Sequence, residues 1–157
     1  MLKIIGQCDS SWGSLHLGTS PKTLCSDGCV TTDLSVLSGW YGNYINPGKL
    51  VAKLKYTPAG LYYWQSGNGV LPFKFVYRYY DTYCANVKVR DVKLLEILNS
   101  KDGACILQVN NYKHWVLLVG YSRIYGFKIF DPFYKEIVYL SKRYGKNIQG
   151  FAEFIRA

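Results

Sequence analysis

Apolar residues recur at helical spacing in three segments of the chain. Between Cys29 and Tyr41, the apolar positions 30, 34, 37 and 41 form one stripe, which predicts a helix that ends at Gly42. A second helix is predicted from Pro47 through position 54, with Asn46 as its N-cap. A third is predicted over positions 92–98, where Val and Leu recur at i, i+3 and i+6.

The second half of the sequence changes to short β-rich runs that are separated by turn residues. The predicted strands are Phe73–Tyr80, Ala104–Val109, Trp115–Tyr121, Phe127–Phe130 and Ile137–Leu140. Helices followed by strands predict an α+β fold. The length of 157 residues, without a Pro/Gly/Ser linker, predicts a single domain over residues 1–157.

The composition narrows the class of protein. The chain is 49% hydrophobic and 17% aromatic, which excludes a disordered polypeptide. An apolar run of about 18 residues is missing, so no membrane span is expected. The first residues do not resemble a signal peptide, and we expect synthesis in the cytoplasm, with any action on a cell wall following release.

The five cysteines and the motif content limit the cofactor chemistry. Five is an odd number, so a complete disulfide framework is not expected, and free thiols in a reducing compartment are predicted. Cys25 and Cys29 are four residues apart, but the sequence has neither a Cys-x-x-Cys nor a His-x-x-x-His spacing, and phosphate-binding glycine loops are missing. We therefore expect no metal, no nucleotide and no other cofactor.

The net charge of +9 leaves two classes of function open. Basic charge with many aromatic residues fits a non-catalytic binding module for cell-wall polymer or nucleic acid, with stacking at residues 62–64 or in Phe73–Tyr80. The Lys and Arg residues are however scattered, and their densest group is only Lys142, Arg143 and Lys146. Such charge is typical of a solvated surface, and nucleic acid is not the expected partner.

The two histidines differ in their surroundings. His16 lies in a Gly/Ser-rich loop, where an ordinary solvated side chain is expected. His114 opens an apolar strand, and Asp131 ends the next one. If these strands form a hairpin that turns near positions 123–124, paired positions sum to about 247, which brings His114 and Asp131 to the same end. A carboxylate there would orient the imidazole, as in a catalytic triad.

Cys29 is the thiol best placed to act as a nucleophile. It follows Gly28 at the predicted start of a helix, where the free N–H groups and the helix dipole favour a thiolate. Cys105, by contrast, lies within an apolar strand and is expected to be inert. A Cys–His–Asp set is therefore available for nucleophilic catalysis.

These residues occur in motifs that resemble the bacteriocin-processing-like branch of the papain superfamily of cysteine peptidases. The motifs are Gln7-Cys8-Asp9-Ser10-Ser11-Trp12, Gly28-Cys29-Val30-Thr31-Thr32, Trp40-Tyr41-Gly42, His114-Trp115-Val116 and Asp131-Pro132. They follow in the family's order over about residues 4–140. Many relatives have Gly-Pro after the nucleophile, where this chain has Val30-Thr31.

The resemblance implies a papain-like fold, in which an N-terminal helical part carries the nucleophile and packs on a C-terminal antiparallel sheet. It implies that Cys29 is the nucleophile, His114 the general base and acid, and Asp131 the residue that orients it. Gln7 would donate its amide to the oxyanion. Cys8, next to Gln7, is an unusual second thiol close to this site.

The expected substrate is a peptide or a peptidoglycan cross-link. The superfamily branch includes leader-peptide processing domains, general peptidases and small bacterial or viral lysins. A basic, free-standing domain resembles the lysins best, because cell walls are anionic. A monomer is expected, and the residues that bind substrate are not predicted.

Overall fold

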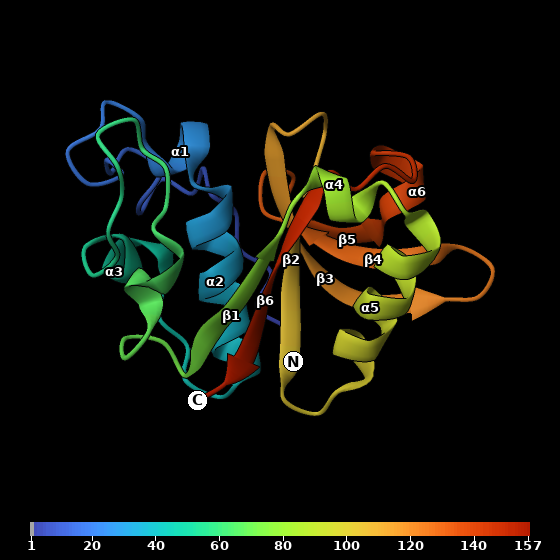
Figure 1. Ribbon diagram of the computed structural model, residues 1–157. Coiled ribbons are helices and arrows are strands. Elements are labelled where there is room, and N and C mark those ends of the chain that lie inside the picture. The colour runs from blue at the N-terminus through green and yellow to red at the C-terminus, as the bar shows by residue number, and fades with distance from the viewer. Residues whose placement is uncertain (1) are drawn as a thin grey trace. The chain divides into compact units, whose positions relative to one another are not determined.

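The computed structural model describes residues 2–157 and has an α+β fold (Figure 1). Its helices are α1 (Leu24–Asp27), α2 (Cys29–Trp40), α3 (Pro47–Val51), α4 (Asp81–Cys84), α5 (Val87–Asn99) and α6 (Leu140–Arg143), with a 3-10 turn η1 (Trp64–Gly67). Its strands are β1 (Phe73–Tyr79), β2 (Gly103–Val109), β3 (His114–Ser122), β4 (Gly126–Asp131), β5 (Glu136–Tyr139) and β6 (Gly150–Arg156). The predicted fold class, α+β, is confirmed at this level.

The chain divides into two compact units. The first contains residues 2–75, 132–135 and 157, and the second contains residues 76–131 and 136–156. The single domain over residues 1–157 stays a prediction. In the part of the chain that the structure describes, none of the helices has the length and hydropathy needed to cross a membrane.

The first unit is built around α2, which is buried on nearly all sides. Leu34 and Leu37, which belong to the predicted apolar stripe, are fully buried, and so is Val36, which does not belong to it. The other faces carry Ser and Thr side chains that satisfy their own polar atoms. Thr32 Oγ1 donates to Gly28 O at 2.8 Å, and Ser38 Oγ donates to Ser35 O at 2.6 Å. These small hydroxyl side chains can therefore be buried, because their hydroxyl groups find hydrogen-bond partners inside the protein.

The second unit contains a six-stranded sheet in the order β1-β6-β2-β3-β4-β5. The β2–β3, β2–β6, β3–β4 and β4–β5 pairs are antiparallel. Helix α5 packs on β2 and β3 (Figure 1). Leu94 and Ile97 of this helix join Leu107, Val116 and Ile129 of the sheet in one hydrophobic core. That core fixes the strands at whose ends His114 and Asp131 lie.

Most of the predicted elements are present, with shifted bounds. The helix predicted over 92–98 is the second half of α5, which begins at Val87. Asn86 is its N-cap and accepts a hydrogen bond from Val89 N at 3.2 Å. The five predicted strands correspond to β1 to β5 within one or two residues. Strand β6 and the short helices α1, α4 and α6 were not predicted.

Candidate active site

The β3–β4 hairpin brings His114 and Asp131 together, as the sequence predicts. Leu117 pairs with Phe130 and Leu118 with Ile129, so the residue numbers of both pairs sum to the expected 247. His114 Nε2 lies 2.9 Å from Asp131 Oδ1. The predicted proximity of the imidazole and the carboxylate is confirmed, while the catalytic roles of the two residues stay predictions.

Asp131 is fully buried and is held by two further residues that the sequence did not single out. Tyr144 donates its hydroxyl to Asp131 Oδ2, and Arg143 donates Nη1 to the same oxygen at 3.2 Å. Arg143 also forms an ion pair with Glu136. The sequence shows Arg143 only as part of a cluster of cations that is typical of a solvated surface. Its position beside a buried carboxylate depends on the fold of α6 against β4.

The electrostatics around Asp131 favour its ionised form. Burial alone would raise the pKa of this carboxyl, but the hydrogen bonds from His114, Tyr144 and Arg143, together with the charge of a protonated His114, lower its pKa below the ordinary value. An ionised carboxylate only accepts hydrogen bonds, so His114 carries its proton on Nε2. In the neutral form of the ring, Nδ1 then has the lone pair and is the nitrogen that can accept a proton.

Replacement of Tyr144 by phenylalanine should weaken the support of Asp131 without removing a ring. The loss of one hydrogen bond to a buried carboxylate should lower the free energy of unfolding by roughly 1–3 kcal/mol at neutral pH. Because the pKa of Asp131 is lowered by folding, its stabilising effect is present above the ordinary value and is lost as the pH falls through the lowered value. The difference between variant and parent should therefore shrink in acid, as measured by urea unfolding at several pH values.

A matched control for this variant is Tyr125→Phe, because Tyr125 is an exposed tyrosine of the same unit. It should unfold like the parent protein at every pH. Equal stability of Tyr144→Phe and Tyr125→Phe would show that the Tyr144 hydroxyl does not hold Asp131.

Cys29 is the first residue of α2, in the other unit. Helix α1 precedes it directly and begins with a capping box between Thr23 and Ser26. Gly28 is both the C-cap of α1 and the N-cap of α2, and no side chain caps the start of α2 with a hydrogen bond. The Cys29 side chain is 8% exposed and is not part of a disulfide. The thiol therefore lies at the positive end of a helix dipole.

Gly28 is required by the close approach of the two helices. A Cβ atom at this position would lie 2.4 Å from Leu24 O and 2.6 Å from Leu24 Cα, which are backbone atoms that cannot rotate away. Any larger residue would push α1 from the start of α2. This explains, in physical terms, the glycine that precedes the cysteine.

Substitution of Gly28 by alanine should therefore lower the free energy of unfolding by about 1–3 kcal/mol, as overpacking usually does. Gly39→Ala is the matched control, because Gly39 lies within α2 and a Cβ atom there would meet only the Tyr44 side chain, at an ordinary contact distance of 3.4 Å. The control should be neutral or stabilising, because alanine favours helix more than glycine. Urea unfolding of both variants checks this, and equal effects would contradict the close approach.

Gln7 lies against α1, the short helix that directly precedes Gly28 and Cys29, in the same unit. Its side chain is 2% exposed, and Nε2 donates to Cys25 O at 2.8 Å and lies 3.4 Å from Leu24 O. Gln7 N donates to Pro132 O at 2.9 Å, which holds the segment. The side-chain amide has two hydrogens, and the shorter contact takes one of them. The other makes only the long contact and could serve a stronger acceptor, such as an oxyanion.

The structure corrects the expectation that the thiols are free. Cys8 and Cys25 form a disulfide, while Cys29, Cys84 and Cys105 do not. An odd number of cysteines excludes complete pairing but leaves room for one bond between residues that folding brings together. This bond ties the segment of Gln7 to α1, so Cys8 has a structural role here rather than that of a spare thiol.

The remaining candidates have ordinary surroundings. Burial raises the pKa of both the Cys84 and the Cys105 thiols, so they remain protonated and poorly nucleophilic. Cys105 is buried in β2, which confirms its predicted place in the core. His16 is exposed, and its Nδ1 lies 3.0 Å from Ser20 O. Among the thiols outside the disulfide, only Cys29 begins a long helix.

No family model matches this chain, and no curated protein matches it. The papain-superfamily resemblance therefore rests on the motifs quoted above. The structure adds that Gln7 and Cys29 belong to the first unit, and that His114 contacts Asp131 in the second.

Proposed function

We propose that this protein is a cysteine peptidase or amidase with a papain-like fold. Cys29 is the nucleophile, His114 the general base and acid, Asp131 the residue that orients His114, and Gln7 an oxyanion donor. The observation that carries the proposal is the 2.9 Å contact between His114 Nε2 and the buried Asp131 carboxylate. It leaves Nδ1 with a lone pair, which is the state that a general base needs.

The reaction proceeds through an acyl-enzyme. Cys29 Sγ gives its proton to His114 Nδ1 and attacks the substrate carbonyl carbon, and the resulting oxyanion accepts hydrogen bonds from Cys29 N–H and the Gln7 amide. Collapse of this intermediate breaks the C–N bond, and the imidazolium protonates the leaving amine. Water then attacks the thioester, gives a proton to His114, and releases the acid and the Cys29 thiol.

The proposed substrate is a peptide bond or an amide bond, with the cross-link of peptidoglycan as the favoured example. Its support is the net charge of +9, which attracts the chain to anionic polymers. The proposal requires Cys29 Sγ within hydrogen-bonding reach of His114 Nδ1 when substrate binds.

Incubation with purified peptidoglycan and, separately, with a denatured protein mixture tests this function. Mass spectrometry of the soluble products should show new amine and carboxyl ends, at bonds that the Cys29→Ala variant leaves intact. Products from both preparations would indicate a general peptidase, and products from peptidoglycan alone a lysin. Binding that weakens steeply with salt, without any cleavage, would favour the non-catalytic binding module instead.

A further inference from the structure

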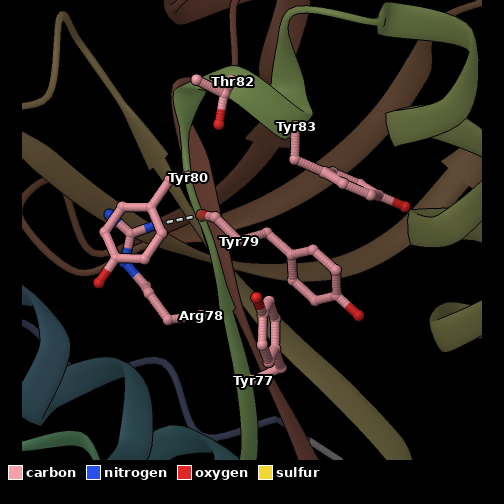
Figure 2. Close-up of a pocket in the computed structure, with 6 residues that line it drawn as sticks. All are labelled: Tyr77, Arg78, Tyr79, Tyr80, Thr82 and Tyr83. Atoms are coloured by element: carbon pink, nitrogen blue, oxygen red, sulfur yellow. Dashed lines mark hydrogen bonds between the residues drawn. The ribbon is translucent and has the colours of Figure 1, made fainter.

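A cavity lies in the sheet unit, at the end of β1 and the start of α4. It has a volume of about 420 Å³, within the range of small-ligand sites. Its lining consists of Tyr77, Arg78, Tyr79, Tyr80, Thr82 and Tyr83 (Figure 2). Tyr79 and Tyr83 pack on the core of this unit, whereas Tyr77 and Tyr80 are largely exposed.

One tyrosine of this cavity anchors the others. The Tyr79 ring stacks on Phe151 at 4.2 Å between centroids and contacts the rings of Tyr77 and Tyr83, each at 4.8 Å. Its hydroxyl donates to Glu153 Oε1 at 3.0 Å. Tyr79 therefore holds the rings of Tyr77 and Tyr83 in place. Tyr77 and Tyr80 remain 57% and 59% exposed. The cavity thus presents rigid aromatic surface to a ligand at low entropic cost.

Arg78 gives the cavity a fixed positive charge. Figure 2 shows Arg78 and Tyr80 on one side of the β1 ribbon, and Tyr79 and Tyr83 on the other. The guanidinium lies 4.3 Å from the Tyr80 ring centroid and 4.8 Å from that of Trp115. It donates to Tyr79 O and to Gln108 Oε1.

Both hydrogen-bond acceptors of Arg78 are neutral. Within residues 2–157, no carboxylate lies within ion-pair distance of the guanidinium. Its charge is therefore not neutralised by a carboxylate in direct contact, and a guanidinium has five N–H donors, of which two are used. An anionic group of a ligand would find donors that are already oriented.

From this combination we infer that the cavity binds a sugar ring of an anionic glycan. Sugar C–H groups carry partial positive charge and pack on the negative faces of aromatic rings. Arg78 and Tyr80 lie on the same side of β1 (Figure 2), so the Tyr80 ring suits the sugar ring while Arg78 suits a carboxylate. A single-stranded nucleic acid fits less well, because such sites follow the backbone with several cations and this lining holds only one.

This site is separate from the proposed peptidase chemistry, because none of its lining residues belongs to the Cys29, His114 and Asp131 set. It would hold a glycan strand on the protein whether or not a bond is cut. Binding is therefore measured with the full-length Cys29→Ala variant, so that failure of the peptidase proposal leaves the result on the cavity readable.

Isothermal titration calorimetry with three probes tests the inference: a tetrasaccharide of alternating glucuronate and N-acetylglucosamine, the neutral tetramer of N-acetylglucosamine, and a thymidine tetranucleotide. The charged tetrasaccharide should bind most tightly. Tyr80→Ala should weaken that binding at least tenfold, whereas Tyr80→Phe should retain most of it because it keeps the ring. Tyr125→Ala, at a tyrosine that is also 59% exposed but lies outside the cavity, should bind like the parent.

Arg78→Gln should remove the preference for the charged over the neutral tetrasaccharide while binding of the neutral one persists. Circular dichroism of each variant separates lost binding from lost folding. The inference is overturned if neither tetrasaccharide binds, if the tetranucleotide binds more tightly than the glycans, or if folded Tyr80→Ala binds like Tyr125→Ala.

Discussion

Replacement of Cys29 by alanine is expected to abolish hydrolysis, lowering kcat by roughly 10⁴-fold or more, as loss of the nucleophile does in other covalent hydrolases. The variant should fold normally, because the side chain is small and α2 is held by fully buried residues such as Leu34 and Leu37. The decrease would be measured as the initial rate of product formation. Circular dichroism of the same preparation would confirm that the fold is retained.

Cys84→Ala is the matched control for this loss. Cys84 is also a buried thiol outside the disulfide, but burial raises its pKa and it lies on α4 in the other unit. This variant should keep the parent's rate. Iodoacetamide at neutral pH should modify Cys29 before Cys84 or Cys105, as seen by peptide mapping. Full activity of Cys29→Ala, or alkylation that spares Cys29, would remove Cys29 from the mechanism.

The parts of the fold that the sequence predicts are those with local signals. Asn46-Pro47 starts α3 as expected, with Asn46 Oδ1 accepting from Lys49 N at 2.9 Å. The β3–β4 register follows from the turn position and the strand period alone, and so the His114–Asp131 contact could be predicted. Each of these features depends on residues that are close in sequence.

The features that could not be predicted depend on residues brought together by the whole fold. Strand β6 pairs with β2 over a sequence separation of more than forty residues, and its Phe151 and Phe154 are buried in a short run that lacks a clear period. The Cys8–Cys25 disulfide and the Tyr144–Asp131 hydrogen bond span only 17 and 13 residues, but the segments that they join are not paired strands of a hairpin, so a turn position does not predict them. Residue type at Cys8, Arg143 or Tyr144 carries no signal for these partners.

The buried faces of α2 show a different limit of pattern reading. Its apolar stripe predicts one buried face, yet Thr31, Thr32, Ser35 and Ser38 are buried as well. Their hydroxyls bond within the interior, for example Ser35 Oγ to Ile45 O at 2.6 Å. Because these small polar residues are buried, the hydropathy pattern does not show that α2 is a central helix. This matters for the site, because a helix that is buried on nearly all sides gives Cys29 a fixed position at its start.

Asp131→Asn is expected to lower kcat by about 10²–10⁴-fold with a smaller change in KM, as the equivalent change does in a serine protease triad. An asparagine can turn its NH₂ group toward His114 Nε2 and donate a hydrogen bond to it. His114 would then carry its proton on Nδ1, where it could no longer accept one from the thiol. The change keeps the shape of the side chain while it removes the charge that Arg143 and Tyr144 bind.

The matched control is Asp91→Asn, because Asp91 forms an ion pair with Arg90 at 2.9 Å in the same unit but outside the site. It should leave kcat and KM unchanged. The decisive measurement is kcat and KM against pH for both variants, each corrected for the folded fraction measured by urea unfolding. A decrease for Asp131→Asn that merely follows its unfolded fraction would make Asp131 a structural residue. A decrease in kcat that persists in fully folded protein, with a shifted pH profile, is what orientation of His114 by this carboxylate requires.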